Sequence, residues 1–94
     1  MSMSLAQKLA ADSVAAVAEG RNLQDVLAEI RAAYPQLTAQ ENGALQDIAY
    51  GCQRYLGSLK YMLGQMLKKP IDNPQLESLL LAAMYQLHYT RNAP

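Results

Sequence analysis

The sequence predicts an all-α protein that forms a single small domain, and three observations support this prediction. Ala and Leu, which both favour helices, fill 30 of the 94 positions, whereas the strand-favouring Val, Ile and Thr together fill only 8. Apolar residues recur at helical spacing in five separate stretches. Hydrophobic residues make up 51% of the chain and charged residues 17%, so a chain of this length can bury one core.

The first two helices are delimited by clear start and stop signals. Gly20 ends the first helix, because glycine can adopt the left-handed conformation beyond a last turn. Asn22 begins the second, since its side-chain oxygen can accept a hydrogen bond from an unpaired amide, and Pro35 ends it. The apolar stripe of the first helix consists of Ala6, Ala10, Val14 and Val17, and that of the second consists of Leu23, Val26, Leu27, Ile30 and Tyr34.

The third and fourth helices are expected to meet at a glycine. Thr38 and Glu41 form a capping box that starts the third helix. Gly57 weakens the helix and Ser58 can cap a restart, so we expect the chain to break or bend there. The third helix carries the stripe Leu45, Ile48, Ala49, Cys52, Tyr55 and Leu56; the fourth carries Leu59, Met62, Leu63, Met66 and Leu67 and ends at Lys68, Lys69 and Pro70.

The last helix begins at Asn73–Pro74, a cap followed by proline at the first helical position. Its only charge before Arg91 is Glu77, and its apolar residues cover nearly the whole circumference. Such a helix usually lies at the centre of a bundle. We therefore expect it to be covered further, by chain beyond Pro94 or by another subunit, which includes a dimer through this helix. Its main stripe consists of Leu76, Leu79, Leu80, Ala83, Met84 and Leu87.

Composition excludes several classes of protein. Cys52 is the only cysteine, so no internal disulfide can form, and this favours an intracellular setting. One cysteine and one histidine, His88, cannot make a structural zinc site. No apolar run approaches the roughly 18 residues of a membrane span. The first twenty residues contain Lys8, Asp12 and Glu19, which leaves no signal-peptide core.

Candidate catalytic groups are few, and we expect this chain alone to have no catalytic residues and no cofactor. Cys52 lies on an apolar stripe, where a free cysteine behaves as a small hydrophobic residue. His88 is expected to pack or to lie at a rim. The glycines Gly51, Gly57 and Gly64 are spaced too widely for a phosphate-binding loop, so we expect them to permit close approach of helices.

Charge is distributed unevenly, although the net charge is zero. Residues 1–50 carry three basic and six acidic residues, whereas residues 51–94 carry five basic and two acidic residues. The five basic residues lie among tyrosines that can stack on bases, which makes them candidate RNA contacts. An ordinary solvated face remains the alternative, because lysines also favour helix C-termini and tyrosines often fill the edge of a core. The candidates are Arg54, Lys60, Lys68, Lys69 and Arg91, with Tyr50, Tyr55, Tyr61 and Tyr89 among them.

Two segments carry a resemblance to a known family. Residues 45–54 (LQDIAYGCQR) and 79–91 (LLLAAMYQLHYTR) resemble the amino-terminal NusB-like domain of the RsmB family of bacterial 16S rRNA cytosine methyltransferases. The resemblance covers residues 1–94 and implies a cytoplasmic, helical RNA-binding domain with 16S rRNA as a partner. A following methyltransferase domain, the second partner, would use S-adenosylmethionine to methylate the 5-position of a cytosine. The full-length parent, rather than this chain, would then be the enzyme.

The resemblance also assigns roles to residues and leaves alternatives. It implies that Gly51 is a close-packing position, that Arg54 is a characteristic polar residue, and that the last helix is scaffold through Tyr85, Gln86 and Tyr89. The family often has glycine at the position of Ala83 and more arginine near the amino terminus, and it continues past the proline at Pro94 into further helices. The alternatives are a stand-alone NusB-type transcription antitermination factor and a protein–protein helical adaptor.

Overall fold

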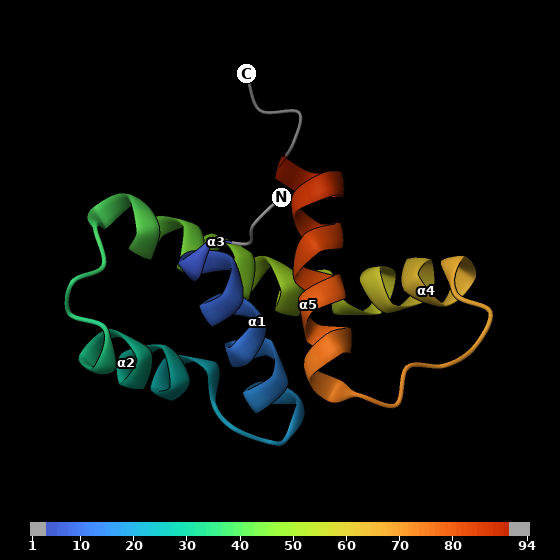
Figure 1. Ribbon diagram of the computed structural model, residues 1–94, viewed down its shortest axis with the longest axis horizontal. Coiled ribbons are helices and arrows are strands. Elements are labelled where there is room, and N and C mark those ends of the chain that lie inside the picture. Colours follow the sequence, from blue (N-terminus) through green and yellow to red (C-terminus); the bar gives the residue numbers. More distant parts are fainter. Residues whose placement is uncertain (1–3, 91–94) are drawn as a thin grey trace.

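The computed structural model describes residues 4–90, and all regular secondary structure within them is helical, which confirms the predicted class. Five α-helices are followed directly by one short π-helix (Figure 1). They are α1 (Leu5–Ala18), α2 (Leu23–Ala33), α3 (Ala39–Arg54), α4 (Leu56–Met66), α5 (Pro74–Tyr85) and the π-helix Gln86–Thr90.

Three of the predicted helix starts are confirmed by their hydrogen bonds. The Asn22 side chain accepts from the backbone N–H of Asp25 at 3.2 Å. Thr38 and Glu41 form the reciprocal capping box expected at α3. Asn73 accepts from two backbone amides at the start of α5, with Pro74 in the first turn. These local contacts satisfy amides that have no partner within the helix, so they fix where each helix begins.

One helix start was not predicted, and both predicted stops in the first half are present. Ser4 and Gln7 form a second capping box, at the start of α1. Gly20, beyond the end of α1, has a φ of 101°, a conformation that glycine adopts without a steric penalty. The α2 helix ends at Ala33, one residue before the Tyr34–Pro35 pair.

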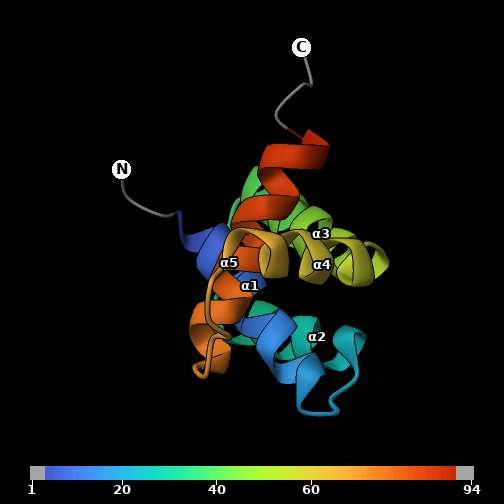
Figure 2. The ribbon, with the colours of Figure 1, turned by 90° about the vertical axis from the view of Figure 1, so that its right-hand side faces the viewer.

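The core lies where α1 packs against α3 and α5. In Figure 1, α3 and α4 follow one another along the long axis of the molecule, and α5 runs across them. The α2 helix packs on α1 and α3, at the end of the molecule away from the π-helix (Figure 2). The α5 helix therefore contacts α1, α3 and α4, as expected for a central helix.

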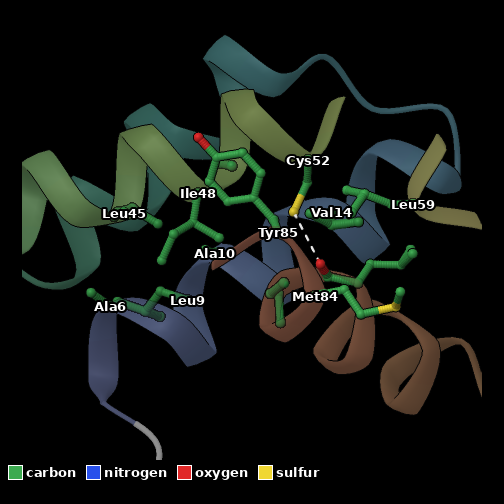
Figure 3. Packing of buried hydrophobic residues seen from close by; sticks show 14 of the residues in the cluster. Ala6, Leu9, Ala10, Val14, Leu45, Ile48, Cys52, Leu59, Met84 and Tyr85 are labelled. Atoms are coloured by element: carbon green, nitrogen blue, oxygen red, sulfur yellow. Dashed lines mark hydrogen bonds between the residues drawn. The ribbon is translucent and has the colours of Figure 1, made fainter. Parts of the chain in front are cut away.

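Cys52 is part of this core and not a reactive group. Figure 3 shows it among Ile48, Val14 and Leu59, with its thiol donating to the carbonyl oxygen of Leu81 at 3.8 Å. Burial, with a smaller contribution from a nearby carboxylate, raises the pKa of the thiol to about 12. The thiolate that a nucleophile requires is therefore disfavoured at neutral pH, which agrees with the predicted packing role.

Of the three glycines expected at close helix contacts, only Gly51 has this role. A side chain added at Gly51 would overlap the aromatic ring of Tyr85, so α3 and α5 can approach closely only because glycine is present. The prediction is wrong for Gly57 and Gly64, because a side chain added at either position would meet no atom within 4 Å. Both are exposed on α4.

The boundary between α3 and α4 lies two residues before the predicted one. Tyr55 alone separates the helices, with φ −108° and ψ 20°, and Gly57 lies inside α4. The reason is tertiary: the Tyr55 ring stacks on Tyr89, and the guanidinium of Arg54 lies 5.5 Å from the centre of the same ring. These contacts fix the bend at the tyrosine, whereas glycine inside a helix costs only about 1 kcal/mol.

The last helix turns a different face inward than the main stripe predicts. Its buried residues are Ser78, Leu81, Ala82, Met84 and Tyr85. Leu79 and Leu80 are only partly buried, and Ala83 is exposed. Several faces of this helix are apolar, so the periodicity alone did not identify the buried one. Exposed apolar side chains remain at both ends of the helical segment, at Leu76 and Leu87.

Candidate nucleic-acid interface

Three of the predicted basic residues line one cavity, which we call the lysine cavity. It lies where α4 ends and the chain returns to the start of α5, and its volume is about 410 Å³. Figure 1 shows this connection running from the far end of α4 back to the lower end of α5. The lining residues are Lys60, Leu63, Gly64, Leu67, Lys68, Lys69, Pro70, Ile71 and Glu77.

The path of the chain after α4 explains why these lysines converge. Leu67 follows the last turn of α4 in an extended conformation, and Pro70 cannot continue a helix, so Lys68 and Lys69 lie on the returning segment. Lys60 faces the same cavity from within α4. Three lysines and one acidic residue, Glu77, line this cavity, and all three lysines are exposed. Such a cavity can bind an anionic group such as a phosphate.

Arg54 lies in a second cavity, which we call the α3 cavity. Its volume is about 370 Å³, and it is lined by Gly43, Gln46, Asp47, Tyr50, Gly51, Arg54 and Tyr85. The positions 43, 47, 50 and 54 recur at intervals of three and four residues, so they share one face of α3. The Tyr85 hydroxyl reaches this face from α5 and donates to Oδ1 of Asp47 at 2.9 Å.

Three tyrosines stack beside the α3 cavity. The ring centroids of Tyr55 and Tyr89 are 4.1 Å apart with 9° between the planes, and those of Tyr85 and Tyr89 are 5.6 Å apart. The π-helix holds Tyr89 in this position, and the side chain of Gln7 on α1 donates to that of Gln86 at 2.7 Å. His88 is exposed at the rim, beside Tyr89.

The structure thus groups the predicted site residues unequally. Lys60, Lys68 and Lys69 come together, Arg54 belongs to a different cavity, and Arg91 lies outside the described residues. Gln46 and Asp47 were not among the predicted site residues. Their helical register with Tyr50 and Arg54 was visible in the sequence and could have indicated a shared polar face.

No group of three or more His, Cys, Asp or Glu side chains within residues 4–90 is arranged to hold a metal ion. No helix in the same range is long and apolar enough to cross a membrane.

Several known proteins that share one name are similar to this chain. The chain is 34% identical over 89 residues to a protein of Sodalis glossinidius named Ribosomal RNA small subunit methyltransferase B, an alignment that covers 92% of this chain and 20% of the relative. Proteins of the same name from Pseudomonas putida and Photorhabdus laumondii are 32% and 33% identical, over 87% and 78% of this chain and 19% and 17% of their own lengths. The chain therefore spans about a fifth of the length of these curated relatives. No solved structure matches it.

A family-level comparison covers nearly every residue. The NusB family matches residues 4–94. This range includes all five α-helices and both cavities. Because the match extends over almost the whole chain and all regular secondary structure in the described residues is helical, the protein belongs to the NusB family.

Proposed function

We propose that this chain is an RNA-binding domain that helps to place 16S rRNA for the methyltransferase domain of a longer protein. The observation that carries the proposal is the lysine cavity, which is lined by three exposed lysines and one acidic residue. Membership of the NusB family and relatives named as small subunit rRNA methyltransferases support it. The alignment covers about a fifth of the length of those relatives, so the remaining length can hold another domain.

The division of labour follows from the residues present. Lysine ammonium groups bind phosphate oxygens as point charges, so the lysine cavity would contact the RNA backbone and carry affinity rather than sequence preference. The methyltransferase domain would methylate a cytosine at its 5-position in the cytoplasm, with S-adenosylmethionine as the methyl donor. Residues 4–90 do not fit that cofactor, because none of them forms the strand and glycine-rich turn that hold an adenosine cofactor in such folds.

A filter-binding titration of a 16S rRNA hairpin at increasing salt tests the proposal. Each phosphate neutralised contributes roughly −0.7 to −0.9 to the slope of log K on log salt, so three lysines predict a slope of roughly −2 to −3. Lys69→Gln should weaken binding and reduce the steepness of the slope by about 0.7–0.9. Lys8→Gln, the same change at an exposed position on α1, should leave the slope unchanged. A wild-type slope near zero, or equal effects of the two changes, would contradict the proposal.

A second candidate function, protein–protein docking, is favoured by one observation. Leu76 is 45% exposed and Leu87 is 56% exposed, which leaves apolar side chains uncovered along the last helical segment. The methyltransferase domain of the longer protein, or a second copy of this chain, would cover them. Sedimentation of the chain at increasing concentration tests self-association: a monomer–dimer equilibrium that Leu87→Ser abolishes supports a dimer, and a monomer at all concentrations excludes it.

A further inference from the structure

The α3 cavity contains a combination of groups that the lysine cavity lacks. It presents a carboxylate, a carboxamide, an aromatic ring and a guanidinium around about 370 Å³. These groups come from Asp47, Gln46, Tyr50 and Arg54, all on α3. A phosphate alone would be repelled by Asp47, and a cationic peptide side chain would be repelled by Arg54. The cavity therefore suits a ligand with an uncharged hydrogen-bonding edge that is attached to an anionic group.

Asp47 is held in a fixed orientation. The Tyr85 hydroxyl donates to its Oδ1, and the Tyr85 ring is itself fixed by its contact with Gly51 and by stacking with Tyr89. Burial, and the hydrogen bond to Asp47, raise the pKa of the phenol to about 12, so the hydroxyl stays protonated and remains a donor at neutral pH. An ionised carboxylate has about four acceptor positions, and one hydrogen bond leaves the others available to a ligand.

The neighbouring groups complement this acceptor. Oε1 of Gln46 accepts from the guanidinium of Arg31 at 3.0 Å, which orients the carboxamide and leaves its N–H groups as donors. Tyr50 is 38% exposed and offers an aromatic surface. Arg54, at the end of the same helix face, supplies positive charge for a phosphate.

We propose that the α3 cavity binds an unstacked guanine of single-stranded RNA, an inference that rests on the proposed RNA-binding function. Guanine alone among the four bases presents two adjacent N–H donors, N1–H and the 2-amino group, on its Watson–Crick edge, and a carboxylate can accept both. The carboxamide of Gln46 donates to guanine O6, Tyr50 stacks on the base, and Arg54 contacts its phosphate. Recognition of unstacked bases by their Watson–Crick edges and by aromatic stacking is the usual basis of sequence-specific RNA binding.

Fluorescence anisotropy with three short labelled RNAs tests this assignment. Each is a single strand of uridines, with guanosine, inosine or a further uridine at the central position. Wild-type protein should bind the guanosine strand about tenfold more tightly than the all-uridine strand. The inosine strand, which lacks the 2-amino group, should fall between them.

Substitutions then separate base recognition from phosphate binding. Asp47→Asn should abolish the preference for guanosine over inosine, while Asp12→Asn, at an exposed position on α1, should preserve it. The affinity ratio is the readout, because neutralising any carboxylate can raise general RNA affinity. The amide oxygen of Asn can still accept from Tyr85, so the fold should persist. Tyr50→Ala should weaken guanosine binding about tenfold, whereas Tyr61→Ala, at a residue that is 69% exposed and lines neither cavity, should not.

Each result has a distinct meaning. Equal binding of all three RNAs by the wild-type protein, or a preference that survives Asp47→Asn, would overturn the guanine site and leave the RNA-binding proposal standing. Lys69→Gln should weaken all three complexes by the same factor and keep their ratios. Failure of every strand to bind would refute the RNA-binding proposal and the guanine site together.

Discussion

Replacing Gly51 by alanine should destabilise the protein, although alanine favours helices and Gly51 lies inside α3. The added methyl group would overlap the ring of Tyr85, which is confined by Tyr55 and Tyr89 and by its hydrogen bond to Asp47. The ring can move away from the added methyl group only if these contacts are disturbed. Gly43→Ala provides a matched control, because Gly43 lies on the same helix with open space around it.

The magnitude follows from three contributions. Overpacking a well-packed core costs about 1–3 kcal/mol. Moving the Tyr85 hydroxyl away from the Asp47 carboxylate costs about 1.5–3 kcal/mol, while the higher helix propensity of alanine returns about 1 kcal/mol. These contributions together give about 1.5–5 kcal/mol, and we expect Gly51→Ala to lower the free energy of unfolding by about 2–4 kcal/mol, the middle of this range. Gly43→Ala should raise it by about 0.5–1 kcal/mol.

Urea denaturation followed by far-ultraviolet circular dichroism measures both changes. A domain of this size has roughly 5–14 kcal/mol of stability, so both variants should remain folded in water. On a Tyr85→Leu background the overlapping ring atoms are gone, and the penalty of Gly51→Ala should shrink to less than about 1 kcal/mol.

Stabilisation by both glycine substitutions would refute the close-contact argument, because it would mean that the ring of Tyr85 has room for a methyl group. An undiminished penalty on the Tyr85→Leu background would refute it as well, since the cost would then have another origin.

Three further predictions concern the core, the titrating groups and a helix cap. Leu81→Ala should lower the free energy of unfolding in urea by about 2–5 kcal/mol, because Leu81 is 1% exposed. Leu76→Ala, at an exposed position, is the control, and an equally small loss for both variants would contradict the central place of Leu81 in the core. The free energy of unfolding should fall as pH rises above about 9 toward 12. In the folded state the pKa values of Cys52 and Tyr85 are each raised to about 12, so in this pH range both groups lose their protons more readily in the unfolded state. Urea denaturation at pH 8, 9 and 10 measures this, and Cys52→Ala should reduce the loss of unfolding free energy between pH 9 and pH 10. A wild-type free energy of unfolding that does not change between pH 8 and pH 10 would contradict the raised pKa values. Asn73→Ala should cost about 1 kcal/mol and Asn73→Ser much less; equal losses in the same assay would show that the cap contributes little.

Local interactions made three of the helix starts predictable. Asn22, Thr38 with Glu41, and Asn73 with Pro74 act within three residues of themselves, so their pattern in the sequence is sufficient. The end of α3 depends instead on a contact between Tyr55 and Tyr89, which are far apart in the chain. The π-helix also escaped prediction, because the apolar stripe of the last helix continues across it.

The candidate site was predictable only in part, for the same reason. The sequence identifies the basic residues as such, but their grouping depends on the return of the chain after α4, which brings Lys68 and Lys69 to the same opening as Lys60. Arg54 differs, because its cavity lies along a single helix and its register is a local property. Pro70 suggests the change in direction of the chain, but not where the chain goes.

The packing of α1 against α5 has a consequence for biosynthesis. The α1 helix is buried by both α3 and α5, and the part of its apolar face that packs on α5 stays uncovered while about 67 residues are added, which takes on the order of 3–13 s at bacterial or eukaryotic elongation rates. During that interval α1 can find only α2 and α3 as partners. The core of this domain therefore closes only after α5 has been synthesised, and a nascent chain arrested before Leu81 would expose the alanine-rich surface of α1 to chaperones and proteases.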